Sequence, residues 1–320
     1  MFLGKLFGKL AIATVAAAAI GAHAFPEKQV QVIVPFAAGS STDIAARTLA
    51  EGLSRAINQG VAVENRTGAE GAIGARAVLS APADGHVMMF TSSSVTVLDP
   101  LMRANLGYDP VNDFTPICTV GGTRFLLNIT GASPYKTVAD IIAAAKAAPG
   151  KITFAYSSAS TRLAGELFQQ VAGVKFRGVP YRSSAQGLTE VAAGQVDIFF
   201  IDTPSAGPFY QSGKIRPVVV SGTGRLKEFP DVPAASEFGL ADFNVTPWFG
   251  LYISGKTPAP ILEQVRTAVS RALARPEMRE SLEKRNILPF AHCGDAMKNY
   301  LNNEINVWRR VTKNAGIEPQ

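Results

Sequence analysis

Short runs of apolar and β-branched residues alternate along the chain with longer stretches in which apolar residues recur every three or four positions. The short runs predict buried strands and the longer stretches predict amphipathic helices. This alternation is typical of parallel strands joined by crossover helices, so the pattern predicts an α/β fold. Strands are predicted at residues 30–34, 61–63, 87–90, 125–129, 152–156, 196–201 and 218–220.

The stretch after the first strand carries apolar side chains at Ala45, Leu49, Leu53 and Ile57, spaced four residues apart. This spacing places them on one face of a helix, which would pack against a sheet. Another helix is predicted to begin at Thr257-Pro258, because proline is favoured in a first turn. The remaining predicted helices lie at 137–147, 161–171, 276–282 and 294–311.

The same local arrangement occurs twice, at residues 31–43 and again at 152–162. In each stretch a buried strand leads into a loop of small and hydroxyl-bearing residues, which ends where a helix begins. The first N–H groups of a helix have no partner within it, and the helix dipole favours negative charge at that end. Two such openings facing each other across a cleft would hold a small carboxylate from both sides.

The two series of elements predict two lobes, one formed by residues 25–120 and 245–320 and the other by residues 121–244. The chain is expected to cross between them at 113–120 and 243–250. Sites in α/β sheets lie at the carboxyl ends of strands, so a ligand cleft between the lobes would collect the loops at those ends.

The first of the two loops is rich in hydrogen-bond donors. Gly39 allows close approach of the backbone, and three successive hydroxyls follow it where a helix cap needs one. Simple capping by one hydroxyl remains the alternative. Asp43 would repel a bound carboxylate, so we expect it to turn toward the protein. The ligand contacts predicted from this loop are Phe36, Ala38, Gly39, Ser40, Ser41 and Thr42.

The second loop ends with Arg162 at a helix opening, where the dipole disfavours a guanidinium. Bidentate pairing with a ligand carboxylate would offset that cost, and a solvated surface arginine is the alternative. Arg182, after another strand, is the rival cationic anchor. Asp202 ends an apolar strand and either accepts a hydrogen bond from the ligand or caps the turn before Pro204. The other predicted contacts are Ser92, Ser93, Ser158, Ser160, Thr161 and Tyr181.

Residues 1–24 have the layout of a secretory signal peptide. Lys5 and Lys9 precede an apolar run at 10–20 that is too short to span a bilayer, and a small-x-small cleavage site ends at Ala24. We expect cleavage there and export to the periplasm. Loss of the two lysines would lower the formal charge from +6 to +4. The remaining basic residues are scattered, without the basic stripe of a nucleic-acid surface.

Little in the sequence supports catalysis or a bound cofactor. Neither His86 nor His292 has a metal-ligand partner at the usual spacing, and no G-x-S-x-G elbow marks a nucleophilic serine. The glycines at 68, 71 and 74 lack the dinucleotide spacing. No metal, cofactor or catalytic residue is predicted, and the rival classes are a secreted serine-dependent hydrolase and a ligand-sensing, partner-binding protein. Cys118 and Cys293 either form a disulfide or are buried free thiols.

Ten short motifs, spread in order over the chain after residue 24, resemble one known family. They are Val34-Pro-Phe-x-x-Gly39 with Thr42-Asp43, Val63-Glu-Asn-Arg66, Ala81-Pro-Ala-Asp-Gly85, Tyr108-Asp-Pro110 with Asp113-Phe114, Leu163-Ala-Gly-Glu-Leu-Phe168, Val179-Pro-Tyr181, Gly194-Gln-Val-Asp197, Asp231-Val-Pro233, Trp248-Phe-Gly250 and Ala315-Gly-Ile317. In this combination the chain resembles the Bug family, the periplasmic solute-binding receptors of tripartite tricarboxylate transporters.

The resemblance implies a two-lobed periplasmic binding protein fold of the type II kind, each lobe a mostly parallel sheet flanked by helices. It also implies a monomer that binds a small organic carboxylate, partly through water, and delivers it to membrane transporter subunits. Two positions depart from the family pattern: Ser40 replaces a second glycine, and Arg162 stands where histidine is frequent. Together with Arg182, Arg162 favours a ligand with a second anionic group, an aliphatic or aromatic dicarboxylate.

Overall fold

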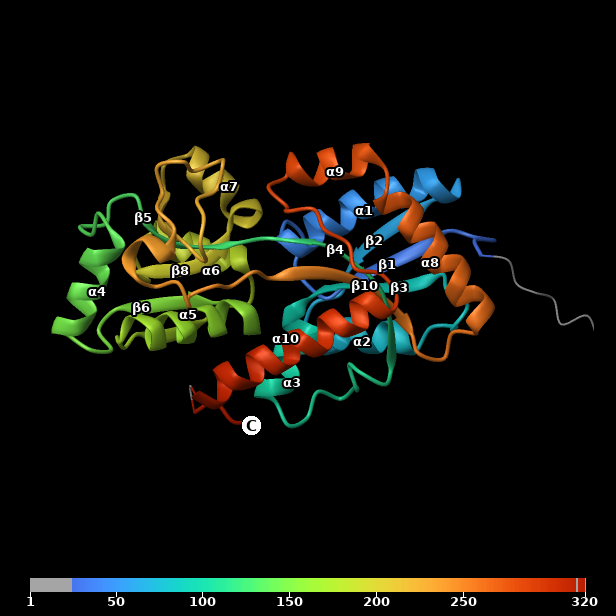
Figure 1. Cartoon of the computed structure of the whole chain (residues 1–320), viewed down its shortest axis with the longest axis horizontal. Coiled ribbons are helices and arrows are strands. Elements are labelled where there is room, and N and C mark those ends of the chain that lie inside the picture. The colour runs from blue at the N-terminus through green and yellow to red at the C-terminus, as the bar shows by residue number, and fades with distance from the viewer. Residues whose placement is uncertain (1–24, 315, 320) are drawn as a thin grey trace, which may run out of the picture.

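Two five-stranded sheets, each flanked by helices, lie side by side in the computed structural model, which describes residues 25–314 and 316–319 (Figure 1). We call each sheet with its flanking helices a lobe, the first lobe being the one that contains the start of the described chain. The predicted signal peptide, residues 1–24, lies outside the described residues.

The sheet of the first lobe has the strand order β2-β1-β3-β10-β4. Strand β10 runs antiparallel to both of its neighbours, and the other pairs are parallel. Its strands are β1 (Val30–Val34), β2 (Val61–Asn65), β3 (Val87–Ser92), β4 (Phe114–Gly122) and β10 (Trp248–Ser254). Its helical segments are α1 (Ser41–Ile57), η1 (Ala69–Gly71), α2 (Ala72–Leu79), η2 (Ser94–Leu98), α3 (Asp99–Met102), α8 (Ala259–Leu273), α9 (Pro276–Glu283) and α10 (Asp295–Asn314).

The sheet of the second lobe repeats this plan with the order β7-β6-β8-β5-β9, in which β5 is the antiparallel strand. Its strands are β5 (Phe125–Thr130), β6 (Thr153–Tyr156), β7 (Arg177–Pro180), β8 (Ile198–Asp202) and β9 (Ile215–Val220). Its helices are α4 (Val138–Ala147), α5 (Ala159–Ala172), α6 (Ser184–Ala192), α7 (Thr203–Gln211) and the short η3 (Ala235–Phe238).

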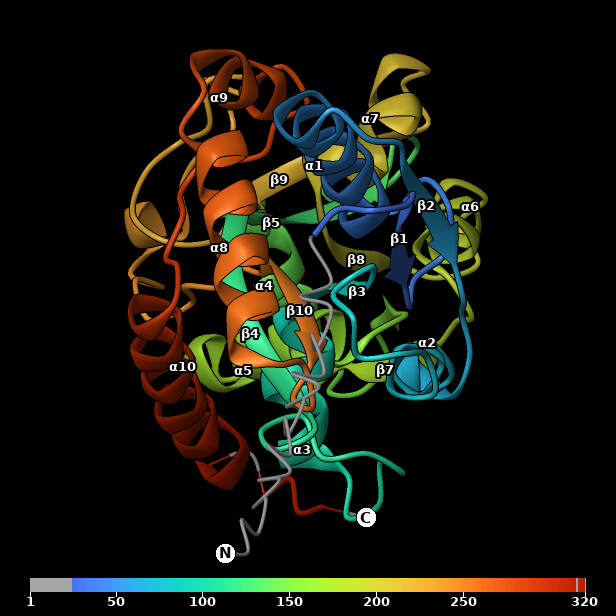
Figure 2. The ribbon, with the colours of Figure 1, turned by 90° about the vertical axis from the view of Figure 1, so that its right-hand side faces the viewer.

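The two sheets are therefore copies of one topology. Strand β1 and helix α1 occupy in the first lobe the places that β6 and α5 occupy in the second, which is the duplication seen in the sequence. Figure 2 views the molecule along its length, with α1 close to α7 of the other lobe. The predicted α/β fold with two mostly parallel, helix-flanked sheets is confirmed.

The first expected crossing segment, 113–120, is wrong in its extent. Most of it is strand β4, because Ile117, Cys118 and Val120 are buried against β10. The chain instead passes to the second sheet between Gly122 and Phe125, and it returns just before Trp248, where β10 begins. In each sheet the antiparallel strand is the one that the chain forms on arriving from the other lobe.

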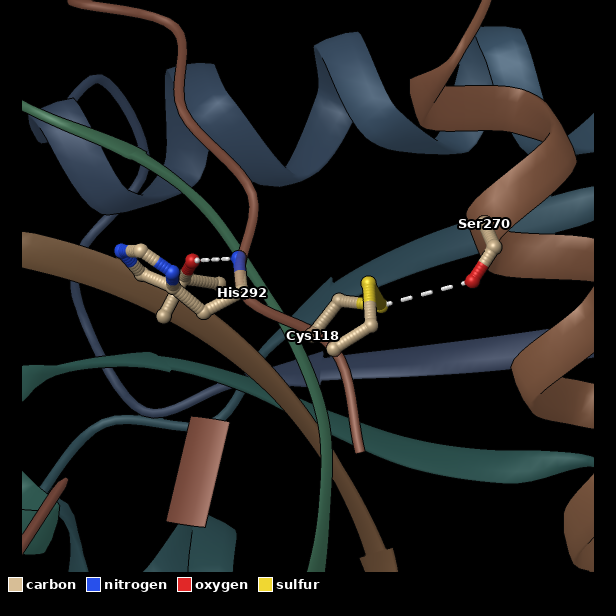
Figure 3. Close-up of a disulfide and its surroundings, with 5 residues drawn as sticks. Cys118, Ser270 and His292 are labelled. Atoms are coloured by element: carbon tan, nitrogen blue, oxygen red, sulfur yellow. Dashed lines mark hydrogen bonds between the residues drawn. A yellow bond between two sulfur atoms is a disulfide. The ribbon is translucent and has the colours of Figure 1, made fainter. Parts of the chain in front are cut away.

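A disulfide joins Cys118 in β4 to Cys293, just before α10, across 175 residues of sequence (Figure 3). Backbone pairing supports it, since the Thr119 amide donates to the His292 carbonyl and the His292 amide donates to the Thr119 hydroxyl, at 2.9 and 2.8 Å. The sequence left this pairing open. The bridge fixes the segment that leads into α10 onto the sheet of the first lobe.

The contact between α5 and β6 depends on a glycine. Gly165 lies in the middle of α5, and a Cβ atom there would come within 2.4 Å of the ring of Phe154, which is 1% exposed. The Phe154 ring packs in turn near Tyr156 and Phe176 and has no room to move away. Gly165 therefore sets how closely α5, whose N-terminus faces the other lobe, approaches its sheet.

We expect Gly165→Ala to lower the free energy of unfolding by about 1–3 kcal/mol, the usual cost of overpacking. Gly207→Ala in α7 is a matched control, since a Cβ there meets nothing within 4 Å. Alanine is the better helix former, but Pro208 follows and disfavours a helical residue that carries a Cβ, so we expect a net change in the free energy of unfolding of less than about 1 kcal/mol. Urea denaturation of both variants gives the comparison, and equal effects would contradict the packing argument.

Candidate ligand site

A cavity of about 870 Å³ lies between the lobes, at the carboxyl ends of strands from both sheets. Twelve of the fifteen contact residues predicted from the sequence line it: Phe36, Ser40, Ser41, Thr42, Ser92, Ser158, Ser160, Thr161, Arg162, Tyr181, Arg182 and Asp202. The other three do not. Ala38 and Gly39 are exposed outside it, and Ser93 is buried behind its wall.

Helix α1 opens on the cavity from the first lobe. Ser40 is its N-cap, and the Ser40 hydroxyl accepts a hydrogen bond from the Asp43 amide at 3.3 Å. Gly39 has a φ of +79°, which favours glycine, whereas Ser40 has a φ of −70°, which any residue adopts. Ser40, at the position where the resemblance implies a second glycine, thus causes no strain and supplies the cap.

Asp43 turns away from the cavity, as expected. Its carboxylate accepts hydrogen bonds from the Gly39 amide at 2.9 Å and from Asn65 at 2.9 Å, and it pairs with Arg47. Burial raises the pKa of Asp43, but these hydrogen bonds and the Arg47 charge outweigh it and hold the pKa below its usual value. The Gly39 amide is occupied by this carboxylate.

Helix α5 opens on the same cavity from the second lobe. Ser158 is its N-cap and forms a capping box with Thr161, in which each side chain accepts from the other residue's backbone N–H. Ser160 and Thr161 are both buried beside it. The hydroxyls of this loop therefore fix the helix opening, and the capping that the sequence left as an alternative is present in both loops.

Two hydroxyls cross between the lobes and bind the opposite helix openings. The Ser41 amide of α1 donates to the hydroxyl of Ser205, in α7, at 3.2 Å. The Ser160 amide of α5 donates to the hydroxyl of Ser94, in η2, at 3.3 Å. Ser94 follows β3 and Ser205 follows β8, which are equivalent strands of the two sheets. The lobes are thus joined by two hydrogen bonds related by the internal duplication.

One backbone amide in each opening has no partner within the described part of the chain. These are the amides of Thr42 in α1 and Ala159 in α5, and both residues line the cavity. Amides at helix N-termini carry the positive end of the helix dipole. The cavity therefore offers one unoccupied donor from each lobe to an anion.

Arg162 lies half-buried in the first turn of α5 with its guanidinium over the ring of Tyr156, 5.7 Å from the ring centre. Burial raises the pKa of Glu166, one turn further along, and the nearby charge of Arg162 opposes that rise. No hydrogen bond or ion pair holds the Arg162 guanidinium among residues 25–314. Arg182, the rival anchor, is exposed at the cavity edge.

Asp202 is fully buried at the floor of the cavity and has several partners. It caps α7 by accepting from the Ser205 amide at 3.0 Å, and it accepts from the Thr123 hydroxyl at 3.3 Å. Burial raises the pKa of Asp202, and hydrogen bonds from Ser41, Ser205 and Thr123 oppose the rise. The cap predicted as one alternative is therefore present, in a residue that also lines the cavity.

Sequence reasoning missed one end of the cavity, which is formed by residues of the first lobe. Gly68 to Gly71 form a loop leading into α2, Asp99 is the first residue of α3, and Arg103 follows α3. Arg103 forms an ion pair with Glu70 in that loop. The only signals in the sequence were the clustered glycines, interpreted as a helix entry, and an aspartate at the end of an otherwise uncharged run, at residues 91–99.

Within residues 25–314 and 316–319, no group of three or more histidine, cysteine or carboxylate side chains could hold a metal ion. In the same part of the chain, no helix combines the length and apolar character needed to cross a membrane.

Two sheets of one topology with a cavity between them define the class as a two-lobed solute-binding protein. The chain belongs to the tripartite tricarboxylate transporter family receptors, whose family model matches residues 45–317. This confirms the resemblance found in the sequence. Members of this family are solute-binding receptors of the periplasmic kind, not enzymes.

Three solved structures are similar over nearly the whole chain. Rpa4515 of R. palustris with adipate is 31% identical, covers 93% of this chain and 100% of its own, and has a TM-score of 0.88. The periplasmic binding protein BugD is 28% identical, with 92% and 100% coverage and a TM-score of 0.85. MatC of Rhodopseudomonas palustris with bound malate is 28% identical, with 90% and 99% coverage and a TM-score of 0.81.

Proposed function

We propose that this chain is a periplasmic receptor that binds a small dicarboxylate between its lobes and delivers it to the membrane subunits of a tripartite tricarboxylate-type transporter. The observation that carries the proposal is the pair of unpartnered amides, Thr42 and Ala159, one from each lobe, in one cavity with the unpaired Arg162. Adipate and malate, the ligands named for two similar structures, are both dicarboxylates.

The ligand contacts that we propose are those predicted from the sequence that line the cavity, with Arg162 as the main anchor. We further propose lobe boundaries at 25–120 with 245–320 and at 121–244, cleavage after Ala24, and a monomeric receptor. The assignment of the strands to two sheets supports this division, although β4 runs on to Gly122, and the family and the signal-peptide layout of residues 1–24 support the exported location.

Binding between the lobes also explains how a ligand is signalled to a transporter. A carboxylate that contacts both helix openings has its full set of hydrogen bonds only when the lobes are closed. Its higher affinity for the closed form shifts the population toward that form, and a ligand with equal affinity for both forms would shift nothing. The closed form is then the one that the membrane subunits recognise.

A thermal-shift panel tests the ligand class. Mono-, di- and tricarboxylates, aromatic acids and amino acids are compared at equal concentration, and binders raise the melting temperature by mass action. We expect the largest shifts with dicarboxylates. Stabilisation by amino acids alone, or by none of the acids, would contradict the proposal.

The role of the helix openings is tested by removing one amide hydrogen. Ala159 is the first residue of α5, where proline is well tolerated, and the preceding Ser158 has the extended backbone that proline requires (φ −162°, ψ 166°). Ala159→Pro should weaken dicarboxylate binding by about 1.5 kcal/mol, roughly tenfold, the low end for a hydrogen bond to a charged group. Ala159→Ser keeps the amide and is the control, measured by calorimetry. Equal loss in both variants would contradict a role for the amide.

A further inference from the structure

Asp99 is a buried residue in the cavity wall, and one oxygen of its carboxyl group has no hydrogen-bond partner among the described residues. The residue is 2% exposed, it lines the cavity between the lobes, and its Oδ1 atom is enclosed without a partner. The other two buried aspartates near the cavity differ, because Asp43 and Asp202 each accept several hydrogen bonds. A buried polar group without a partner costs about 1–3 kcal/mol, so its presence beside a ligand cavity calls for an explanation.

A π-helical turn places Asp99 at the cavity. Segment η2 is a π-helix, and the Asp99 amide donates to the carbonyl of Ser94, five residues earlier. This bond places Asp99 next to Ser94 along the helix axis. In an α-helix, two residues five positions apart would instead point to different sides of the helix. The Ser94 hydroxyl contacts the Ser160 amide of α5. Asp99 therefore lies one turn beyond the contact between η2 and the opening of α5.

The surroundings of Asp99 keep its carboxyl group neutral. Burial, together with the negative charge of Glu70, raises the pKa of Asp99 to about 8, and Arg103 only partly opposes this because it is paired with Glu70. The neighbouring Tyr108 donates its hydroxyl to the Val95 carbonyl. On α10, which packs against η2 and α3, Glu304 accepts from the Trp248 indole. None of these groups supplies Asp99 with a partner.

We propose that Asp99, in its neutral form, is a ligand-binding residue that donates a hydrogen bond to the second carboxylate of a dicarboxylate held at the helix openings. The inference rests on the proposed function and adds a specificity-determining contact at the first-lobe end of the cavity. A neutral acid tolerates a dianionic ligand, whereas an ionised Asp99 would repel it. The Asp99 hydroxyl gains the acceptor that the protein does not provide.

The direction in which dicarboxylate affinity changes with pH follows from the protonation of Asp99. Only protonated Asp99 donates, so binding is at full strength below the pKa and weakens as the pH rises above it. With a pKa of about 8, the affinity should fall about tenfold between pH 7 and pH 9. A dicarboxylate is fully ionised throughout this range, so the ligand itself contributes no change.

The test uses α,ω-dicarboxylates from succinate to adipate, the matching monocarboxylates, and 6-aminohexanoate, measured by calorimetry at pH 7 and 9. In the wild type, the affinity for the best dicarboxylate should fall about tenfold between pH 7 and pH 9. The affinity for the matching monocarboxylate should change less than threefold. Asp99→Asn keeps a donor in the same place that does not titrate, so at both pH values it should bind the dicarboxylate within about threefold of the affinity of the wild type at pH 7. Asp99→Ala should bind it at least tenfold more weakly and leave the monocarboxylate unchanged.

Several outcomes would overturn the inference. Tighter binding of 6-aminohexanoate than of adipate, with loss of that preference in Asp99→Asn, would make Asp99 an ionised acceptor. A flat pH profile in the wild type would contradict a donor that titrates in this range. If carboxylates bind but Asp99→Ala changes the affinities for the mono- and the dicarboxylate by the same factor, this inference fails and the proposed function stands. If no carboxylate binds the wild type, both fail.

Discussion

Replacing Arg162 with alanine should weaken the binding of a dicarboxylate by about 2–3 kcal/mol, roughly 30- to 150-fold, because a bidentate charged contact is lost. The guanidinium is half-buried at the opening of α5, and among the described residues it forms no ion pair, although the charge of Glu166 lies near it. Its contact with the Tyr156 ring orients it without satisfying its donors. Titration calorimetry at constant ionic strength gives the difference in affinity.

Arg182→Ala gives the comparison with the rival anchor, because it removes the same charge from a proposed contact that is exposed at the edge of the same cavity. It should change affinity less than about threefold, as expected for an exposed and screened charge. Arg162→Lys separates charge from geometry, and it should restore only part of the affinity since lysine lacks the planar fork. Full affinity in Arg162→Ala with loss in Arg182→Ala would move the anchor to Arg182.

The sequence pattern predicted best the strands that consist of an uninterrupted apolar run. All seven predicted strands are present, and each is a short apolar run in its sheet. The strands that were not predicted contain a proline or a glycine within the apolar run. Strands β4 and β7 contain Pro116 and Pro180, and both lie at sheet edges, where a strand tolerates a residue without an N–H. Proline argues against a central strand only, and sequence does not say which strand is at an edge.

Strand β10 was missed for a different reason. It is central and fully buried, but Gly250 interrupts its apolar run. A Cβ atom at Gly250 would come within 2.8 Å of Met297 in α10. The glycine therefore reflects a contact with a helix about 50 residues away, which no local pattern reveals.

The site shows the same division between local and distant information. The two helix openings were predictable because strand, hydroxyl loop and helix start are adjacent in sequence. The hydroxyls that bind their amides, Ser94 and Ser205, come from the other lobe in each case. Asp99 needed the π-turn of η2 to reach the cavity, and the sequence of that segment has no distinctive signal for a π-helix. The contacts between the lobes are therefore the part of the site that could not be predicted from neighbouring residues in the sequence.

Removing the disulfide should have the largest effect on stability. It closes a loop of 175 residues that contains the entire second sheet, so in the chain-entropy model its loss destabilises the protein by about 3–5 kcal/mol. The suitable variant is Cys118→Ala with Cys293→Ala, because Cys118 is fully buried and alanine adds no polar group there. Urea denaturation of the variant and of the oxidised wild type measures the difference.

The same bridge should matter little for binding, because neither cysteine lines the cavity. The bridge fastens the start of α10 to β4, and both belong to the first lobe, so the movement of one lobe against the other does not stretch it. We therefore expect the double alanine variant to bind a dicarboxylate within about twofold of the wild type at temperatures where it is folded, a change too small to reflect a lost contact. Wild-type protein unfolded under reducing conditions should match the variant in stability. Loss of affinity without loss of stability would mean that α10 takes part in closure, since it packs against η2, the segment that contacts α5 across the lobes.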